Sequence, residues 1–221
     1  MTGERPSSDL PPERVAGAGD LQAVLNVSRE TIERLEVYAS LLRKWNPAIN
    51  LVGASTLSNL WQRHIWDSAQ LFPLLPPLSP DRSRVLVDLG SGAGLPGLIL
   101  AILGAGAVHL VESDSRKAAF LREAARATET EAELHPCRAE ALVPFPADAV
   151  TARALASLTA LLPLAAPFLS GGGIGLFLKG ARLEDELTGA EKEWSMAFDL
   201  LPSRSDASGR ILRLHQLRRR G

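Results

Sequence analysis

One short segment of the chain combines an acidic residue with closely spaced glycines. Residues 85–97 read VLVDLGSGAGLPG, an apolar run that ends in Asp88 and continues into a glycine-rich turn. Glycine takes positive φ angles at no steric cost and lets the backbone come close to a ligand. In a parallel sheet such a turn lies at the carboxyl edge, where ligands bind. The segment therefore predicts a ligand-binding loop between a buried strand and a helix.

Two classes of ligand fit this loop. The GxGxxG spacing from Gly92 to Gly97 matches dinucleotide-binding folds, in which a pyrophosphate lies on a helix N-terminus. Asp88 favours S-adenosylmethionine, because its carboxylate repels a pyrophosphate and attracts a sulfonium or an ammonium. Pro96 also favours it, since proline lacks the amide that would donate to a phosphate. The loop therefore indicates S-adenosylmethionine rather than a nicotinamide dinucleotide.

Further polar residues follow the next predicted strands. Glu112 ends the second strand, where a carboxylate accepts both hydroxyls of a ribose, a group that both ligand classes contain. Glu140 follows the third strand and either contacts an adenine or is a favourable charge at a helix N-terminus. Arg153 follows the fourth strand in apolar surroundings and either completes the site or forms a salt bridge. Lys179 ends the fifth strand and either meets a substrate phosphate or extends its ammonium into solvent.

Alternating strands and helices must position these residues. Apolar runs predict strands at 85–87, 108–111, 134, 149–150 and 174–178, with a closing edge strand at 210–217. Apolar residues three or four apart predict helices over 98–103, 115–128, 155–169 and 183–194. This alternation predicts an α/β fold with a doubly wound, mostly parallel sheet.

The first 80 residues have a different character. Residues 1–20 are rich in Pro, Gly and Ser and are expected to be a disordered tail. Ser28 is expected to cap a helix from Arg29 to Trp45 that ends at Asn46-Pro47. A second helix is expected over 58–72. We therefore divide the chain into a tail (1–20), an N-terminal helical subdomain (21–80) and a cofactor-binding domain (81–221).

The composition excludes several classes of protein. Among the 221 residues, Cys137 is the only cysteine, so a disulfide framework and a cysteine metal site are excluded. No apolar run reaches the roughly 18 residues that a membrane span needs, and the N-terminus lacks the apolar centre of a signal peptide. We therefore expect a cytoplasmic protein, and a monomer. The net charge of −1 does not indicate a nucleic-acid binder. Five arginines near the C-terminus form either a solvated end or a phosphate contact: Arg210, Arg213, Arg218, Arg219 and Arg220.

Seven short motifs between about Leu41 and Gly180 occur in a characteristic order. They are Lys44-Trp45-Asn46, Asn50-Leu51, Arg63-His64-x-x-Asp67-Ser68, the loop at 88–97, Arg138-Ala139-Glu140, Arg153-Ala154 and Leu178-Lys179-Gly180. Together they resemble the RsmG/GidB family, the bacterial 16S ribosomal RNA guanine-N7 methyltransferases. The resemblance implies a class I, Rossmann-like methyltransferase fold with an N-terminal helical extension, and S-adenosyl-L-methionine as the cofactor. Glu112 stands where an aspartate is more usual in the family.

The resemblance also assigns roles to individual residues. The implied cofactor-binding residues are Gly90, Gly92, Leu95, Glu112, Ser113, Asp114, Ala139, Glu140 and Arg153. The candidates for holding the substrate, 16S ribosomal RNA or a small-subunit particle, are Arg63, His64 and Lys179. His64 has a structural role as its alternative. Guanine N7 carries a free lone pair, so no catalytic acid or base is assigned, and no metal. An NAD(P)-dependent oxidoreductase and a noncatalytic RNA-binding protein with a vestigial pocket remain as alternatives.

Overall fold

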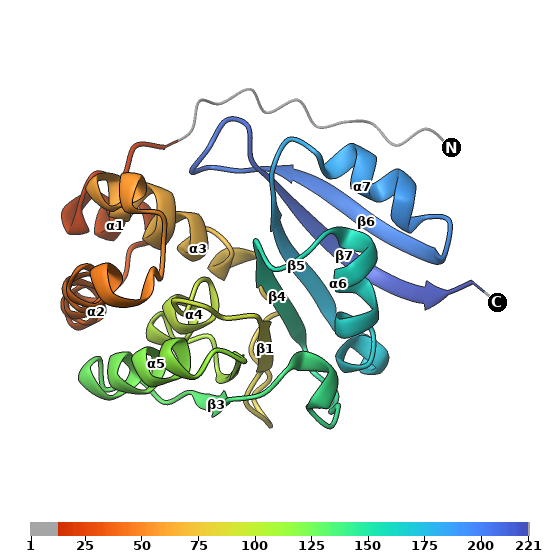
Figure 1. The fold of residues 1–221 in the computed structure, drawn as a ribbon, viewed down its shortest axis with the longest axis horizontal. Helices are drawn as coiled ribbons and strands as arrows, with labels where there is room; N and C mark the ends of the chain where they lie inside the picture. The colour runs from red at the N-terminus through yellow and green to blue at the C-terminus, as the bar shows by residue number, and fades with distance from the viewer. Residues whose placement is uncertain (1–12, 221) are drawn as a thin grey trace.

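The structure is a computed structural model that describes residues 13–220 (Figure 1). Its helices are α1 (Ala18–Leu25), α2 (Arg29–Ile49), α3 (Asp67–Ala69), α4 (Gly97–Ile102), α5 (Ser115–Ala127), α6 (Leu158–Ala165) and α7 (Leu183–Ala190). Its strands are β1 (Val85–Leu89), β2 (Ala107–Val111), β3 (Glu133–His135), β4 (Ala149–Arg153), β5 (Ile174–Lys179), β6 (Trp194–Pro202) and β7 (Arg210–Arg219). Short 3-10 or π turns lie at 54–59, 61–66, 72–74, 139–141 and 168–171.

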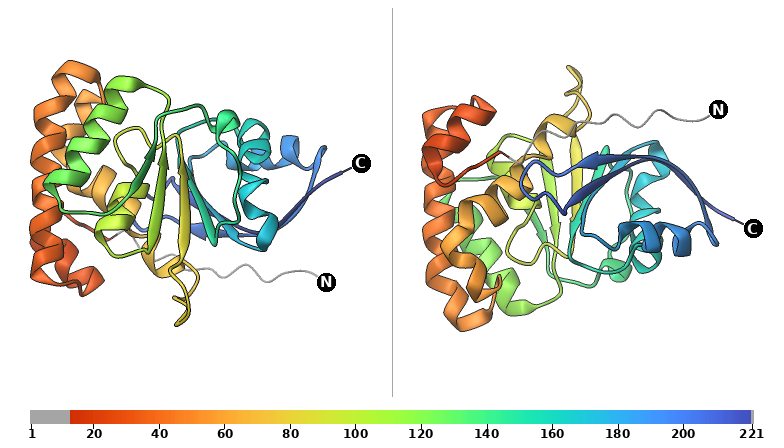
Figure 2. Two further views of the ribbon diagram at one scale, coloured as in Figure 1. Left: turned by 90° about the horizontal axis from the view of Figure 1, so that it is seen from below. Right: turned by 90° about the horizontal axis from the view of Figure 1, so that it is seen from above.

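The strands form one sheet in the order β3-β2-β1-β4-β5-β7-β6. Strands β1 to β5 run parallel, and β7 is antiparallel to both of its neighbours. Helices α1, α2 and α5 lie on one side of the sheet, and α6 and α7 on the other (Figure 2). The predicted α/β fold, a doubly wound and mostly parallel sheet with an N-terminal helical part, is confirmed.

Strand β1 lies at the centre of this sheet because it is apolar on both faces. Leu86 and Val87 are both fully buried. Leu86 belongs to the hydrophobic cluster that contains residues of α2, α4 and α5, whereas Val87 belongs to the one that contains residues of α6 and α7. A strand covered on both faces needs such a continuous apolar run. The strand carries Asp88 and the glycine loop to the carboxyl edge of the sheet.

The C-terminal part of the sheet differs from the prediction. The segment at 210–217 was expected to be an edge strand, but β7 lies between β5 and β6, and β6 is the edge. The helix expected over 183–194 ends at Ala190, and Trp194 begins β6. Trp194, Met196 and Phe198 are less exposed than the residues between them. This period of two marks a strand, and the helical interpretation overlooked it.

Three predicted helices also have other boundaries. Helix α2 continues through Pro47 to Ile49 and ends at Asn50, whose φ is 49° and whose N–H donates to the Asn46 carbonyl. Pro47 lies in the last turn, where its missing N–H removes only one helical hydrogen bond. The segment expected as a helix over 58–72 consists of short 3-10, π and α turns. The helix expected over 155–169 is α6 followed by a 3-10 turn.

Residues 13–20 are ordered, so this part of the predicted tail is wrong. Val15 is fully buried, and its N–H donates to Oε1 of Gln62 at 2.7 Å. The rest of the predicted tail, residues 1–12, lies outside the described residues. The helical segment shares a hydrophobic cluster with the sheet, and the boundary near residue 80 stays a prediction. Among residues 13–220, no helix has both the length and the apolar character that crossing a bilayer requires.

Candidate functional site

The glycine loop after β1 is held in a fixed shape. Gly90, Gly92 and Gly94 have φ values of +66°, +56° and +83°, in the region that favours glycine. The fully buried Tyr38 of α2 donates its hydroxyl to the carbonyl of Ala93 at 2.7 Å. This contact joins the N-terminal helices to the loop. Sequence analysis missed Tyr38, because nothing in its local pattern separates it from an ordinary core residue.

Asp88 has a different role from the predicted one. Its carboxylate is fully buried, accepts from the Gly97 N–H at 3.1 Å and accepts from the Thr151 hydroxyl at 2.7 Å. It therefore caps the N-terminus of α4 and does not face the ligand. Burial raises the pKa of Asp88 to about 6, against the opposing effect of these hydrogen bonds.

This arrangement decides between the two ligand classes. In a dinucleotide-binding fold a pyrophosphate lies on the helix N-terminus and accepts from its free amides. Here the Gly97 N–H already donates to the Asp88 carboxylate, and the Leu98 N–H donates to the Gly94 carbonyl at 2.9 Å. Neither amide is therefore available to a phosphate. A Cβ on Gly97 would lie 2.6 Å from Asp88 Oδ2, so only glycine fits there. The anion position of a dinucleotide is filled by the protein itself.

A pocket of about 410 Å³ opens between the glycine loop and the carboxyl ends of the parallel strands. Its volume suits a small-molecule ligand. The predicted cofactor residues in its wall are Gly90, Gly92, Leu95, Glu112, Ser113, Ala139, Glu140 and Arg153. Leu51, Lys117 and Leu155 also line it, and no role was predicted for them. Only the fold shows that Leu51, in the N-terminal part, reaches a pocket built on the sheet.

Glu112 is suited to hold a ribose. Its side chain is mostly buried, with Oε2 accepting from the Gly92 N–H at 2.8 Å and Oε1 from the Asp114 N–H at 2.7 Å. Each carboxylate oxygen keeps a second lone pair, so both can accept a hydroxyl of a bound ribose. The two backbone contacts fix the carboxylate against the glycine loop.

Asp114 was predicted as a cofactor-binding residue, and the structure places it outside the pocket wall. Its carboxylate caps α5 by accepting from the N–H groups of Arg116 at 2.8 Å and Lys117 at 3.2 Å. These hydrogen bonds lower the pKa of Asp114 below its ordinary value. Capping an N-terminus is a common role for aspartate, and sequence alone does not separate it from ligand binding.

A larger cavity of about 1050 Å³ adjoins the pocket. Both hollows are lined by Leu51, Arg153, Ala154 and Leu155. The three predicted substrate residues, Arg63, His64 and Lys179, all lie in the wall of the larger cavity. Ala154, at the junction, has a φ of +52°, which is strained for a residue with a side chain. A ligand in the pocket and a second ligand in the cavity would meet at this junction.

Arg153 joins the two hollows through a polar network. Its Nη1 lies 3.1 Å from Asp67 Oδ2 and 3.2 Å from the carbonyl of Arg63, and its Nη2 lies 3.2 Å from His64 Nδ1. The side chains of Arg153 and Asp67 are each 18% exposed. Sequence analysis left a site residue and a salt bridge as alternatives; the structure shows the salt bridge, on a residue that lines both hollows.

The side chain of His64 is held inside the protein. It is 7% exposed, and its Nε2 lies 2.7 Å from the Thr56 hydroxyl. Burial, followed by the nearby Arg153 and Arg63, lowers the pKa of His64 to about 4. The ring is therefore neutral at neutral pH, with Nδ1 free to accept from Arg153. The structural alternative for His64 fits this arrangement.

The cations of the larger cavity differ in their availability. The Lys179 ammonium donates to Glu186 Oε2 at 2.8 Å and to the Ala156 carbonyl at 2.9 Å, and its side chain is only 9% exposed. It is therefore not extended into solvent. Arg63 is exposed and forms an ion pair with Asp206. Two exposed arginines of the cavity wall form no ion pair within residues 13–220; they are Arg182 and Arg210.

The sheet order, the acid-anchored glycine loop and the pocket at the carboxyl edge define a Rossmann-like, class I methyltransferase fold. A similar solved structure is a TehB-like SAM-dependent methyltransferase from Corynebacterium glutamicum. Its TM-score is 0.51 at 16% identity, and the match covers 82% of this chain and 97% of that one.

The sequence comparisons are more specific. The family described as "rRNA small subunit methyltransferase G" (GidB) matches residues 31–203. A relative named "Ribosomal RNA small subunit methyltransferase G" from Rhodospirillum centenum is 61% identical, over 92% of this chain and 93% of the relative. A protein of the same name from Rhodospirillum rubrum is 58% identical, over 87% of this chain and 94% of the relative. The chain belongs to the GidB family, which confirms the resemblance seen in its motifs.

Proposed function

We propose that this protein transfers a methyl group from S-adenosyl-L-methionine to N7 of a guanine in 16S ribosomal RNA. The observation that carries the proposal is the pair of adjoining hollows that share Arg153, Ala154 and Leu155. The smaller pocket has a volume that suits a nucleoside cofactor and a carboxylate, Glu112, that can bind its ribose. The larger cavity has room for a larger substrate. The family and the names of the relatives support ribosomal RNA of the small subunit as that substrate.

The cofactor is assigned to the smaller pocket. Glu112 accepts the ribose hydroxyls, and Ala139 and Glu140 flank the adenine. Gly90, which approaches Leu155 of the shared junction, and Leu95 line the part assigned to the methionine moiety. The sulfonium methyl then points toward the larger cavity. The fold neighbour, a SAM-dependent methyltransferase by its name, supports this cofactor.

The reaction needs little acid–base chemistry from the protein. The N7 lone pair attacks the sulfonium methyl, the carbon–sulfur bond breaks, and the cofactor leaves as a neutral thioether. N7 loses no proton in this step, so a general base is not required. Catalysis then rests on holding the two reactants in line. His64 is neutral and bonded to Arg153 and Thr56, and it acts by positioning Arg153.

The RNA is assigned to the larger cavity and its rim. N7 lies on the Hoogsteen edge, so the target guanine must lie in a loop or be turned out of a helix. Arg182 and Arg210 form no ion pair among residues 13–220 and are the cations proposed to bind phosphates, whereas Lys179 is held by Glu186. Because the net charge is only −1, RNA binding relies on this local group of cations. We further propose that the enzyme acts as a monomer in the cytoplasm.

A modification assay tests the proposal. Small subunits or 16S RNA from cells that lack the protein are incubated with the purified protein and S-adenosylmethionine, and nuclease digests are analysed by mass spectrometry. We expect one new 7-methylguanosine at a single position. A Glu112→Gln variant serves as the control and should form much less of it. Methylation at several positions, or of another base, would contradict the proposal.

A calorimetric titration separates the alternative functions. We expect binding of S-adenosylmethionine and of its demethylated product, and none of NAD or NADP, because Asp88 occupies the anion position. Nicotinamide binding would favour an oxidoreductase. Binding of RNA without either cofactor would favour a noncatalytic RNA-binding protein.

A further inference from the structure

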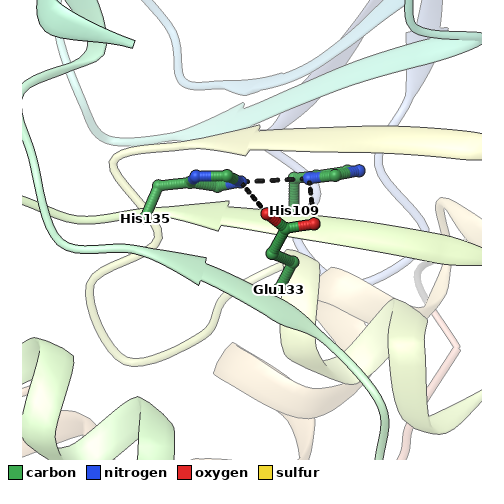
Figure 3. Close-up of side chains that lie close together, drawn as sticks. All are labelled: His109, Glu133 and His135. Carbon is green, nitrogen blue, oxygen red and sulfur yellow. Dashed lines mark hydrogen bonds and ion pairs between the residues drawn. The ribbon is translucent and has the colours of Figure 1, made fainter.

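Three side chains on the edge of the sheet opposite β6 converge outside the pocket (Figure 3). Nδ1 of His109 on β2 lies 3.0 Å from Nε2 of His135 on β3. The carboxylate of Glu133 on β3 lies 3.4 Å from the His109 nitrogen and 3.6 Å from the His135 nitrogen. One ligand atom from each residue lies within 4.8 Å of the others.

The strand register brings these residues together. β2 and β3 pair in parallel with His109 opposite Glu133. Successive side chains of a strand point to opposite faces, so Glu133 and His135 lie on the same face as His109. Phe145 packs against this group, with its ring centroid 4.6 Å from that of His109. Sequence analysis predicted no metal, because the spacing of these residues follows no ligand motif.

The chemistry of the group is that of a cation site. Two imidazole nitrogens that face each other at 3.0 Å must share one proton or share a cation, since two lone pairs repel. In a tetrahedral zinc site with bonds of roughly 2.0–2.1 Å, ligand atoms lie about 3.3 Å apart. The observed separations are close to that value: 3.0 Å between the two nitrogens, 3.4 Å from His109 Nδ1 to Glu133 Oε2 and 3.6 Å from His135 Nε2 to Glu133 Oε1. Two histidines and one glutamate form a known zinc ligand set.

We propose that His109, Glu133 and His135 bind a divalent transition-metal cation of the zinc type. Imidazole and carboxylate ligands suit such ions, whereas Mg²⁺ and Ca²⁺ prefer an all-oxygen shell. The two imidazoles are 16% exposed and the carboxylate is 65% exposed. The cation therefore enters from the side of Glu133, and water completes its coordination there.

The cation would connect an edge strand to the cofactor pocket. β3 has three residues and lies at the edge of the sheet. The carbonyl of His135 accepts from the N–H groups of Glu112 at 3.1 Å and Cys137 at 2.9 Å, and both of these residues line the pocket. A cation between His109 and His135 would fix β3 against β2, and with it this wall of the pocket. The role is structural and does not depend on the proposed methyl transfer.

Metal titration of the untagged full chain tests the proposal. The protein is treated with EDTA, dialysed and titrated with Zn²⁺ by calorimetry, and with Co²⁺ by visible absorption. We expect one equivalent of Zn²⁺ to bind and to raise the melting temperature, and Co²⁺ to give the intense bands of a four-coordinate nitrogen–oxygen site. Mg²⁺ at the same concentration should produce neither effect.

Variants locate the site. Glu133→Gln and His135→Gln each remove one ligand and should weaken Zn²⁺ binding more than about 100-fold, beyond the roughly 10–100-fold that the loss of an outer-shell partner costs. Glu133 is largely exposed, so its variant should fold normally, which circular dichroism checks. His215→Gln is the control, because His215 pairs with Asp199 at 2.7 Å on another part of the sheet. The absence of Zn²⁺ binding, unchanged affinity in both ligand variants, or equal loss in the control would overturn the proposal.

Discussion

The cofactor pocket and the larger cavity are built from different parts of the chain. Apart from Leu51, the pocket is lined by residues between Gly90 and Leu164. The larger cavity draws on five separate segments: 51–53, 63–67, 153–157, 178–186 and 203–210. Its wall is closed by the loop between β6 and β7, which binds α3 and the turn before it. Gln70 contacts Ser203 and Ser205 there at 3.1 Å, and Arg63 pairs with Asp206.

The bonds that shape the two hollows also differ. Beside the pocket, two acids each accept a backbone N–H of the glycine loop, Glu112 from Gly92 and Asp88 from Gly97. In the cavity, side chains from distant segments bond to one another, as Arg153 does to Asp67. If the proposed assignment holds, the shared cofactor binds beside a local motif, whereas the specific substrate binds to a surface assembled from distant segments.

The largest expected effect is an opposite pH dependence of stability in the two regions. The pKa of Asp88 in the folded protein is raised to about 6, so folding takes up a proton in this pH range. The contribution of Asp88 to the free energy of unfolding therefore falls as pH rises from about 4 to 6. The folded pKa of His64 is lowered to about 4, so folding releases a proton and its contribution rises over a similar range. We expect the unfolding free energy of the wild type relative to Asp88→Asn to fall by roughly 3 kcal/mol between about pH 3 and 7.

Relative to His64→Gln, the unfolding free energy of the wild type should rise by roughly 3 kcal/mol over this pH range. Urea denaturation at several pH values measures both differences. Two curves of the same sign would show that one of the groups does not titrate as its surroundings indicate.

The next effect distinguishes two neighbouring acids of the cofactor region. Glu112→Gln keeps the size of the side chain but places an amide against backbone donors, and it removes charged acceptors for the ribose. We expect the dissociation constant of S-adenosylmethionine to rise about 100-fold, or about 2.7 kcal/mol. Asp114→Asn should preserve both the cap of α5 and the cofactor affinity, since asparagine also caps helices. Calorimetry of both variants checks this, and equal losses would place Asp114 in contact with the cofactor.

Arg153 links the two regions, and its loss should affect turnover more than cofactor binding. We expect Arg153→Ala to lower kcat about 30-fold, or about 2 kcal/mol. If Arg153 acts through its ion pair, Asp67→Asn should reproduce part of the loss, and the double variant should be no slower than Arg153→Ala. Single-turnover methylation measures all three variants. Fully additive losses would mean that the ion pair does not position Arg153.

A smaller effect is expected where the glycine loop meets the junction. A Cβ on Gly90 would lie 2.4 Å from Leu155 Cδ1, in addition to the backbone cost of a φ of +66°. We expect Gly90→Ala to weaken cofactor binding about tenfold, or 1.4 kcal/mol, and a second change, Leu155→Ala, to restore part of the affinity. Gly104→Ala is the matched control, since Gly104 has a φ of +84° and open space around it.

Gly104→Ala should cost about 1 kcal/mol of stability and leave cofactor affinity unchanged. Calorimetry and urea denaturation give the two quantities. A Leu155→Ala change without any rescue would show that the contact with Leu155 is not what weakens binding.

The smallest effect concerns the cations of the larger cavity. Arg182→Ala should weaken binding of a 16S RNA transcript about threefold and reduce the salt dependence of the binding constant by about one charge. Lys179→Ala should leave the salt dependence unchanged, because its ammonium is already paired with Glu186. Filter binding at several salt concentrations compares the two variants. The reverse result would mean that Lys179 leaves Glu186 when RNA binds.

Sequence reasoning predicted the wall of the smaller pocket better than the contacts of the larger cavity. Glu112 and Gly90 could be placed because a buried strand followed by an acid or a glycine turn has a recognisable local pattern. The direction of the Asp88 carboxylate could not be predicted, because it depends on contacts with α4 and with Thr151 on β4. The pairing of Arg153 with Asp67 spans 86 positions, and no local pattern encodes it.

The same limit applies to the fold. The parallel strands were predicted from apolar runs such as 85–87, and their sheet follows from the βα alternation. The position of β7 inside the sheet depends on β6, whose alternation is weak because three of its residues are only partly covered: Met196, Phe198 and Leu201.

The insertion of β7 between β5 and β6 sets an order for folding during synthesis. Every residue that lines the cofactor pocket has been translated once Leu164 has been added. The wall of the larger cavity still needs the loop at 203–209, and β5 has no partner on one side until β7 emerges. Domains generally fold as units. The pocket residues, although translated first, therefore wait for the last strand before the sheet that carries them is complete.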